Sequence, residues 1–289
     1  MAGPLEPRGR RVPASVMCSP LVLPWEHMAE PIRSCDDRPV SFLRSFGKRH
    51  QGVSSGQDAL SAMTVAQGWE AYAQGVSRQE GPVGKVWNDP ALMGLDAESP
   101  EDVVPYLDRT VFAPFFEQCG VMLEIGAGGG RFTEVLLPKC RKLIAVDTSP
   151  TMLEILRERF AGDSRLECQL VDGQGLGQIA DDSVDAAFSY GVFVHLQHWD
   201  IYHYLVELRR VLRPGGKALI QHSNVLSDLG WAKFTREVPK QLNKHKLPWT
   251  FIANTPQLMG EFIARAGFGS IELKTDVARR DCIALFRKP

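Results

Sequence analysis

The sequence lacks a long apolar segment and an excess of charge. No apolar run approaches the roughly 18 residues that a helix needs to cross a bilayer, so no membrane span is expected in these 289 residues. The 33 basic and 34 acidic residues leave a formal net charge of −1. A chain so close to neutrality has no broad field that would draw it onto nucleic acid or an anionic membrane.

Cysteine is scarce and scattered. The six cysteines form no C-x-x-C pair and have no histidine at metal-ligand spacing, so neither a disulfide framework nor a bound metal is expected. Reduced thiols in a cytoplasmic protein are the simplest interpretation. Nothing in the composition indicates an oligomeric state. The hydrophobic share of 44% is enough to bury an ordinary globular core.

The N-terminal segment, residues 1–57, differs in composition from the rest. It is rich in Pro and Arg and shows no sustained periodicity, which predicts a disordered tail. Its one apolar stretch is interrupted by Pro20 and Pro24, so it matches a signal peptide poorly, and a transit peptide is the weaker alternative. Residues 58–98 are expected to form an N-terminal helix, up to Gln74, and a cap loop.

Residues 99–289 alternate between short apolar segments and amphipathic helical stretches. This alternation predicts an α/β, Rossmann-like doubly wound sheet, mostly parallel, with helices on both faces. A helix should open at Ser99-Pro100 and reach about Cys119. A final helix near 256–266 and two closely spaced strands predict an antiparallel pair at one edge. The expected strands are 121–125, 142–146, 166–171, 184–190, 217–221, 267–274 and 281–287, and the other helices are 131–137, 150–160 and 199–212.

The strongest motif runs from Val121 to Phe132. An apolar strand leads into a turn with Gly126, Gly128 and Gly130, and the turn opens a helix. Missing Cβ atoms let such a turn bend tightly and let its backbone approach a ligand, whose polar groups can meet the free N–H groups of the helix start.

Asp147 ends the next predicted strand, 17 residues past Gly130. A carboxylate at about this spacing accepts hydrogen bonds from ribose hydroxyls in nucleoside-binding α/β folds. The alternative is an N-cap for the helix after it, a role that Ser149 before Pro150 fills better. The dinucleotide fingerprint G-x-G-x-x-G would need glycine at position 131, where this chain has arginine, so a dehydrogenase is disfavoured.

The run from Glu124 to Gly130, together with four later segments, resembles the class I S-adenosylmethionine-dependent methyltransferases, specifically a broad bacterial small-molecule branch. The four segments match that family in order: Asp147–Met152, Val171–Gly173, Asp182–Phe188 and Leu212–Lys217. The resemblance covers roughly residues 100–289. It implies S-adenosylmethionine as cofactor and transfer of its methyl group to a small-molecule acceptor.

The resemblance also implies roles for individual residues. The three glycines line the methionine part of the cofactor, flanked by Glu124 and Arg131, either of which could instead hold the loop. Asp147 and Thr148 form the ribose end, and Met152 packs on the adenine. Asp172 accepts from the adenine amino group beside Gly173. Tyr190 and Gly191 lie at the methionine amino group, where the acceptor pocket begins.

Two histidines are candidate proton acceptors. His195 comes after the fourth predicted strand and His222 ends the fifth, and both strand ends face the ligand crevice of an open α/β sheet. A base is needed only if the acceptor must lose a proton. The alternative is that each histidine lines the pocket or makes a local hydrogen bond.

Aromatic residues outside the shared motifs are expected to close the acceptor pocket. Trp69, Tyr72 and Trp87 would come from the N-terminal part and Trp231 from a cap insertion, 223–250, with Phe193 after the fourth strand. For any one of them, plain packing is the alternative.

Three other functions stay open. Nucleic-acid amino-methylating enzymes usually carry an Asp/Asn-Pro-Pro-aromatic motif after the fourth strand, whereas this chain has Ser189-Tyr190-Gly191-Val192-Phe193. The near-neutral charge also argues against a nucleic-acid partner. A protein substrate and a non-catalytic S-adenosylmethionine-binding module are the remaining alternatives.

Overall fold

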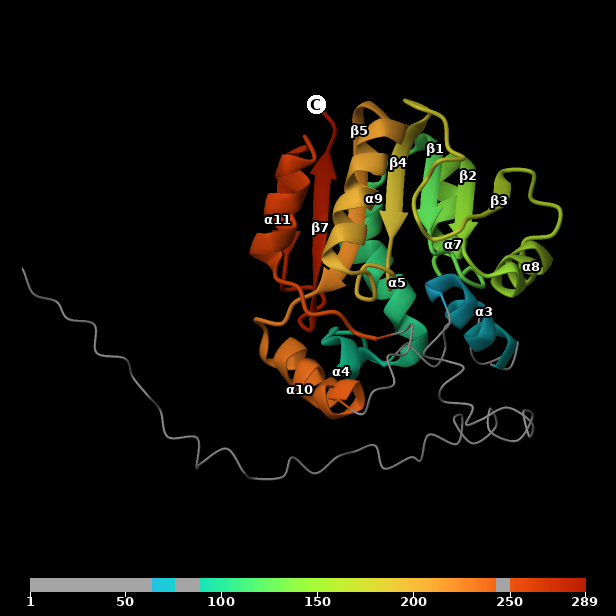
Figure 1. Ribbon diagram of the computed structural model, residues 1–289. Helices are drawn as coiled ribbons and strands as arrows, with labels where there is room; N and C mark the ends of the chain where they lie inside the picture. Colours follow the sequence, from blue (N-terminus) through green and yellow to red (C-terminus); the bar gives the residue numbers. More distant parts are fainter. Residues whose placement is uncertain (1–63, 76–88, 243–249) are drawn as a thin grey trace, which may run out of the picture. The chain divides into compact units, whose positions relative to one another are not determined.

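The computed structural model describes residues 64–75, 89–242 and 250–289, all within one compact unit. The predicted tail and Trp87 lie outside the described residues. Within the described part, seven strands form one sheet in the order β3-β2-β1-β4-β5-β7-β6 (Figure 1). The strands are β1 (Cys119–Ile125), β2 (Cys140–Asp147), β3 (Leu166–Leu170), β4 (Val184–Ser189), β5 (Leu212–Ser223), β6 (Gly269–Lys274) and β7 (Asp281–Arg287).

The pairing of the strands confirms the predicted sheet. β1 to β5 pair parallel to one another, and β7 runs antiparallel between β5 and β6. The strand order reverses direction between β1 and β4. In open α/β sheets, ligands bind outside the carboxyl ends of the strands at such a reversal.

Two predicted elements differ in the structure. The helix expected from Ser99 to about Cys119 is a series of short turns: a 3-10 turn (Pro100–Asp102), α5 (Val103–Leu107), a π turn (Asp108–Phe112) and α6 (Ala113–Phe115). Pro114 cannot donate a backbone hydrogen bond within the helix, and the wide π turn lies directly before it. β5 begins at Leu212 rather than 217, and residues 213–216 form an irregular stretch of the strand.

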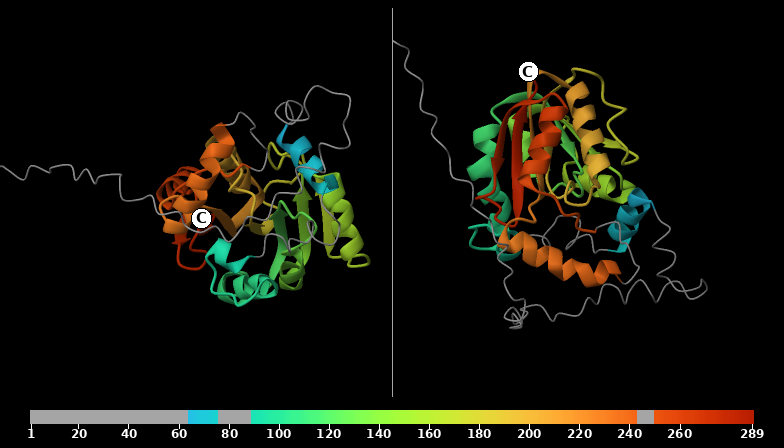
Figure 2. Two further views of the ribbon diagram at one scale, coloured as in Figure 1. Left: turned by 90° about the horizontal axis from the view of Figure 1, so that it is seen from below. Right: turned by 60° about the vertical axis from the view of Figure 1, so that its left-hand side comes forward.

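Helices cover both faces of the sheet (Figure 2). α9 (His198–Val211) and α11 (Pro256–Arg265) pack on one face, where Leu123 and Ile125 point. On the other face Met122 points toward α5, the π turn and α7 (Thr133–Leu136), and α8 (Pro150–Arg159) packs on the same side against Ala145. Neighbouring β1 residues thus serve opposite cores, as the period of two in a strand requires.

α8 begins as the sequence predicts. The Ser149 hydroxyl oxygen accepts a hydrogen bond from the Met152 amide at 3.1 Å, and Pro150 occupies the first helical position. Because Ser149 caps the helix, the Asp147 carboxylate is left for other partners.

α3 (Val65–Gly75) covers the start of α8 through one acidic side chain. Glu70 accepts hydrogen bonds from the hydroxyls of Ser149 and Thr151, each at 2.6 Å, and from the Thr151 amide at 3.2 Å. Burial disfavours the charged form of Glu70, but these donors together with Gln74 outweigh it and lower the pKa of the carboxyl. The first part of the predicted helix, residues 58–63, lies outside the described residues.

Two further helices meet at the turn before β7. α4 (Pro90–Met93) contributes the Leu92 carbonyl, which accepts from Arg280, and the Gly94 carbonyl after the helix accepts from the Arg279 amide. The Ser227 hydroxyl, just before α10 (Asp228–Leu242), donates to the Arg280 carbonyl. α3, α4 and α10 therefore lie at the end of the sheet where the parallel strands finish (Figure 1). No helix in the described ranges is long and apolar enough to cross a membrane.

The Glu70 contacts predict a test of how α3 is held. Replacing Glu70 with Ala removes an acceptor shared by three donors outside α3, so backbone amides of α3 should exchange with deuterium roughly tenfold faster or more. Gln67→Ala is the control, because Gln67 is exposed and its hydrogen bonds are made with Thr64 of the same segment. Equal exchange of α3 in both variants would show that Glu70 does not hold the helix.

Candidate active site

The site is organised around the carboxylate of Asp147 at the end of β2. Its two oxygens accept hydrogen bonds from the Gly128 amide at 2.8 Å and the Ser149 amide at 2.9 Å. Burial raises the pKa of Asp147, against the lowering effect of these two amides and of the Thr148 amide. A carboxylate offers about four acceptor positions, so Asp147 can still accept from further donors.

The glycine turn after β1 is folded by its own amides. Gly126 and Ala127 both donate to the Val146 carbonyl, and Gly128 donates to Asp147. These three amides are therefore not free to meet a ligand. What the turn offers is space: Gly128 has a φ of +53°, and a Cβ built there would meet nothing within 4 Å. A ligand can approach the backbone closely at this point.

Glu124 lies inside the fold, below the turn. Only 2% of its surface is exposed, and it accepts a hydrogen bond of 2.6 Å from the Thr133 hydroxyl at the start of α7. Burial raises the pKa of Glu124 to about 8, against the opposing effect of the Thr133 hydrogen bond. The carboxyl is thus mostly protonated at neutral pH. Of the two roles left open by the sequence, the structure favours holding the loop.

The residues expected at the adenosine end come together under α3. Met152 is buried and packs with Tyr72 and Ala73. The methyl group of Thr148 lies 3.1 Å from where a Cβ of Gly173 would stand, so glycine lets the ends of β2 and β3 approach closely. Asp172 is exposed beside this contact, and it accepts a hydrogen bond from the Gln174 amide at 2.8 Å.

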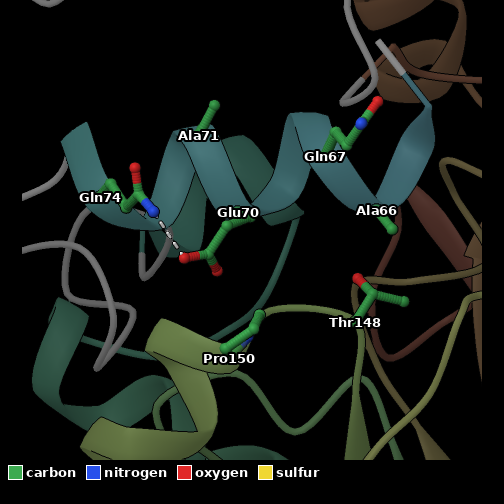
Figure 3. A pocket seen from close by; sticks show the side chains of 7 residues that line it. All are labelled: Ala66, Gln67, Glu70, Ala71, Gln74, Thr148 and Pro150. Carbon is green, nitrogen blue, oxygen red and sulfur yellow. Dashed lines mark hydrogen bonds between the residues drawn. The ribbon is translucent and has the colours of Figure 1, made fainter.

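A pocket of about 400 Å³ opens between α3 and the loop before α8 (Figure 3). Neither Asp147 nor Met152 lines it. It is therefore a side pocket of the adenosine end, and Thr148 is the expected site residue that reaches it. Its lining residues are Ala66, Gln67, Glu70, Ala71, Gln74, Thr148 and Pro150.

At the other end of the site, Arg131 and Tyr190 lie in one buried polar group. The guanidinium of Arg131 stacks over the Phe132 ring at 4.6 Å, and that ring is 4.9 Å from the ring of Tyr190. Nε and Nη2 of Arg131 and the Tyr190 hydroxyl are buried without a hydrogen-bond partner. Burial lowers the pKa of Arg131 to about 10, and nearby Arg280 acts in the same direction.

His195 lies between α3 and a segment after α10. Its ring is edge-to-face with Trp69, with centroids 5.1 Å apart, and Nδ1 is 3.1 Å from the Thr250 carbonyl oxygen. A carbonyl can only accept, so this contact fixes the tautomer with the proton on Nδ1 and the lone pair on Nε2. The structure thus brings together His195, Trp69 and Tyr72, whose ring is 5.7 Å from that of Trp69.

His222 is enclosed in β5. It has no exposed surface, its Nδ1 is 2.8 Å from the Ser223 carbonyl oxygen, and its Nε2 is buried without a hydrogen-bond partner. Burial lowers the pKa of His222 to about 4. The imidazole is therefore neutral and weakly basic at neutral pH.

Two aromatic residues expected in the acceptor pocket lie elsewhere. After Gly191, whose φ is +80°, the chain turns, and Phe193 enters the core beneath α9, where it packs on Tyr204. Trp231 is 53% exposed on α10 and packs on Phe234 of the same helix. Neither forms a pocket wall in this structure, because packing on α9 and on α10 respectively determines their positions.

Several residues that shape the site were not predicted. Arg159 of α8 donates to the Gly129 carbonyl at 2.5 Å and so holds the glycine turn. Gln221 accepts from the Gly191 amide and donates to Asp281, which Arg280 also binds. No motif spacing indicates these contacts, since they join elements distant in sequence. No group of three or more metal-ligating side chains occurs in the described part of the chain.

Comparison with known proteins finds one domain that this chain shares with them. A family model described as a methyltransferase domain matches residues 123–220. An uncharacterized methyltransferase-like protein of Schizosaccharomyces pombe is 30% identical over 124 residues, 42% of this chain and 45% of that protein. A probable ribosomal RNA small subunit methyltransferase A of Methanosarcina mazei is 32% identical over 122 residues, 39% of this chain and 45% of that protein. The chain thus spans less than half the length of these relatives.

Solved structures share the fold. A methyltransferase in complex with the Haloferax volcanii Trm112 activator superposes with a TM-score of 0.57 at 16% identity, over 78% of this chain and 98% of that one. A methyltransferase of Archaeoglobus fulgidus, described as dependent on S-adenosylmethionine, superposes with a TM-score of 0.51 at 16% identity. The match covers 65% of this chain and 94% of that one. Residues 123–220 thus form a methyltransferase domain. The chain is thus similar to methyltransferases in this domain, and it shares the fold of one described as dependent on S-adenosylmethionine.

The raised pKa of Glu124 predicts a pH dependence of stability. Between its ordinary value of 4.5 and about 8, the unfolded chain releases this proton while the folded protein keeps it. The contribution of the Glu124 carboxyl to the free energy of unfolding is therefore at its full value below pH 4.5. It is lost as the pH rises to about 8. Glu124→Gln should abolish this loss, on the order of 5 kcal/mol, in urea denaturation at several pH values. The exposed Glu117→Gln is the control, and a pH profile of Glu124→Gln that parallels wild type would contradict the assignment.

Proposed function

We propose that the chain transfers a methyl group from S-adenosylmethionine to a nucleophilic oxygen, nitrogen or sulfur atom of a small-molecule acceptor. One observation carries the proposal: Asp147 presents spare acceptor positions beside the open face of Gly128, at the carboxyl edge of a methyltransferase domain. A nucleoside fits this arrangement, because two neighbouring ribose hydroxyls need a carboxylate and close backbone approach.

The contacts of the site support a division of roles. Asp147 would hold the ribose hydroxyls, with Thr148 beside it. Met152 would pack on the adenine, backed by Tyr72, and Asp172 would accept from the adenine amino group next to Gly173. The turn with Gly126, Gly128 and Gly130 would line the methionine part.

Little chemistry is then required of the protein. When bound, S-adenosylmethionine supplies an activated methyl group on a sulfonium. The residues of this chain hold and orient the reactants, which can lower a barrier by roughly 7–11 kcal/mol. α3 helps to exclude water, since Trp69 and Tyr72 lie over this edge of the sheet.

His195 is the proposed proton acceptor for a methyl acceptor that must lose a proton. Its Nδ1 is fixed on a carbonyl, so Nε2 carries the lone pair a base needs. His222 is the weaker candidate, because it is enclosed and its pKa is lowered to about 4.

RNA is the second candidate acceptor, favoured by the similarity to a probable ribosomal RNA methyltransferase. The net charge of −1 and the absence of an Asp/Asn-Pro-Pro-aromatic motif after β4 favour a small molecule. Assays of methyl transfer to metabolite, RNA and protein fractions distinguish these acceptors. Transfer to none of them, with the cofactor bound, would indicate a non-catalytic binding module.

The ribose role of Asp147 is tested by Asp147→Ala. Two hydroxyls lose a charged acceptor worth about 1.5–3 kcal/mol per hydrogen bond, so affinity for S-adenosylhomocysteine in isothermal titration should fall at least ~10-fold. Asp181→Ala, an exposed residue paired with Arg210, is the control. Unchanged affinity in Asp147→Ala would refute the role.

The two histidines are distinguished by Asn variants. His195→Asn should lower turnover by ~10²–10⁴-fold with cofactor affinity nearly unchanged, and higher pH should restore part of the rate because more acceptor is already deprotonated. His222→Asn should keep near-normal turnover. Turnover of both variants, measured across pH with the identified acceptor, shows which histidine takes the proton. If both variants keep normal turnover, positioning alone drives the transfer.

A further inference from the structure

Gln221 is a buried polar residue near the end of β5, and both ends of its amide are in use. Only 1% of its surface is exposed. Its Oε1 accepts a hydrogen bond from the Gly191 amide at 2.8 Å, and its Nε2 donates to the Asp281 carboxylate at 2.7 Å. Because β4, β5 and β7 are neighbours in the sheet (Figure 1), this one side chain joins the turn after β4 to the start of β7.

The orientation of this amide is fixed by the chemistry of its partners. A backbone N–H can only donate and a carboxylate can only accept, so a flipped amide would lose both hydrogen bonds. Asp281 is held in turn by Arg280, which donates to it through Nε at 3.1 Å and through Nη2 at 2.7 Å. Arg280 also donates to the Leu92 carbonyl of α4 at 3.3 Å. Arg280, Asp281 and Gln221 therefore form a series of hydrogen bonds with one allowed direction.

The turn that Gln221 holds carries the candidate base. Gly191 begins this turn with a φ of +80°, and the His195 amide closes it on the Val192 carbonyl at 2.9 Å. The far end of the turn is held by the segment after α10, through the Val194 carbonyl and the His195 ring. Gln221 thus holds the start of the turn that presents His195.

Gly191 leaves the front of this turn open to reactants. The residue is exposed, and a Cβ built on it would meet nothing within 4 Å. Its amide nevertheless points into the protein, at Gln221. The next side chain, Val192, lies where a Cβ of Gly126 would stand. The turn therefore borders the glycine turn after β1, beside which the reactants would meet.

Packing alone does not require a polar series here. Asp281 has no exposed surface, and replacing a buried ionic group with apolar residues of similar volume often leaves stability unchanged or raises it. Apolar residues could not, however, supply an oriented acceptor for the Gly191 amide.

We infer that Gln221 is a positioning residue for methyl transfer. Oriented by Asp281 and Arg280, it fixes the start of the turn from Gly191 to His195 and so places the His195 ring beside the acceptor. The inference rests on the proposed function, in which His195 takes a proton from the acceptor. It adds a requirement for alignment, since a displacement of about 1 Å at a reacting group can lower a rate ~100-fold.

The first measurement compares Gln221→Met, which keeps the side-chain length but neither hydrogen bond, with wild type. The rate of transfer of tritiated methyl groups from saturating S-adenosylmethionine to a metabolite extract should fall ~10–100-fold. Affinity for S-adenosylhomocysteine should stay nearly unchanged. Gln118→Met is the control, because Gln118 is exposed before β1 and donates to the Pro138 carbonyl. A loss of affinity in place of a loss of rate would overturn the inference.

The surroundings of Gln221 determine how a carboxyl would behave in its place. Burial and the adjacent Asp281 would raise the pKa of such a carboxyl. Arg280 and Arg131 would lower it, and the Tyr190 hydroxyl is a further titratable group of this cluster. Since the charge of Arg280 is already bound by Asp281, we expect the pKa of the carboxyl in Gln221→Glu to be raised.

Gln221→Glu then separates orientation from packing. The protonated carboxyl can accept from the Gly191 amide and donate to Asp281, as the amide does, whereas the ionised carboxyl has no proton to donate. Relative to wild type at the same pH, Gln221→Glu should regain rate as the pH falls from about 8 to about 6. Gln221→Met should show no such recovery. Equal profiles of the two variants would show that the orientation of the side chain is irrelevant, against the inference.

Action through His195 is tested by combining variants. If Gln221 acts by holding His195, the double variant of Gln221→Met with His195→Asn should be about as slow as His195→Asn alone. Single effects that multiply in the double variant would place the action of Gln221 elsewhere and contradict the inference.

Hydrogen exchange of the Gly191 amide is a readout that does not depend on activity. This amide should exchange ~10-fold faster or more in Gln221→Met, and in Gln221→Glu it should be protected at low pH only. Unchanged exchange in Gln221→Met would overturn the inference. If Gln221→Met does not fold, Gln221→Glu compared with itself across pH decides both readouts. Wild type that transfers no methyl group refutes the proposed function instead, and the Gly191 amide still decides whether Gln221 holds the turn.

Discussion

The hydrogen bonds of the Asp147 carboxylate are the constraint on which the site depends. They join the glycine turn after β1 to the start of α8, through Gly128 and Ser149. Ser149 also donates to Glu70 of α3, so one connected series runs from the turn to the covering helix. Burying a carboxylate costs free energy, and shaping a turn would not by itself require one. The spare acceptor positions of Asp147 can also bind a ligand. A ligand bound there would be connected to both the turn and α3.

The charges of the site are divided between its two ends. Glu124, Asp147 and Glu70 belong to the β1–β2 side, whereas Arg131 and Arg280 belong to the side of β4 and β7. Burial, and to a smaller extent the charge of Asp147, raises the pKa of Glu124, so this carboxyl keeps its proton. Arg131 has no such route, because a guanidinium stays protonated at any ordinary pH. The basic end therefore keeps its charge.

The sequence predicts the strand ends well and the contacts between elements poorly. Apolar runs and glycine turns are local signals, so the strands, the Ser149 cap and the position of Asp147 were all predictable. Phe193 and Trp231 were assigned to a pocket because aromatic residues suit one, yet which face an aromatic ring meets depends on a turn at Gly191 and on the packing of α10. Glu70, Arg159 and Arg280 act across distances of about 30 to 190 residues, and no spacing rule reaches that far.

The glycine turn shows why recognition at one end of the site falls to side chains. The amides of Gly126, Ala127 and Gly128 fold the turn and bind Asp147, so these three build the site and are not free to hold a ligand anion. A side chain directly after the turn can take over that role, but its charge must then wait unpaired in a buried place. An unpaired charge of this kind makes the folded protein less stable.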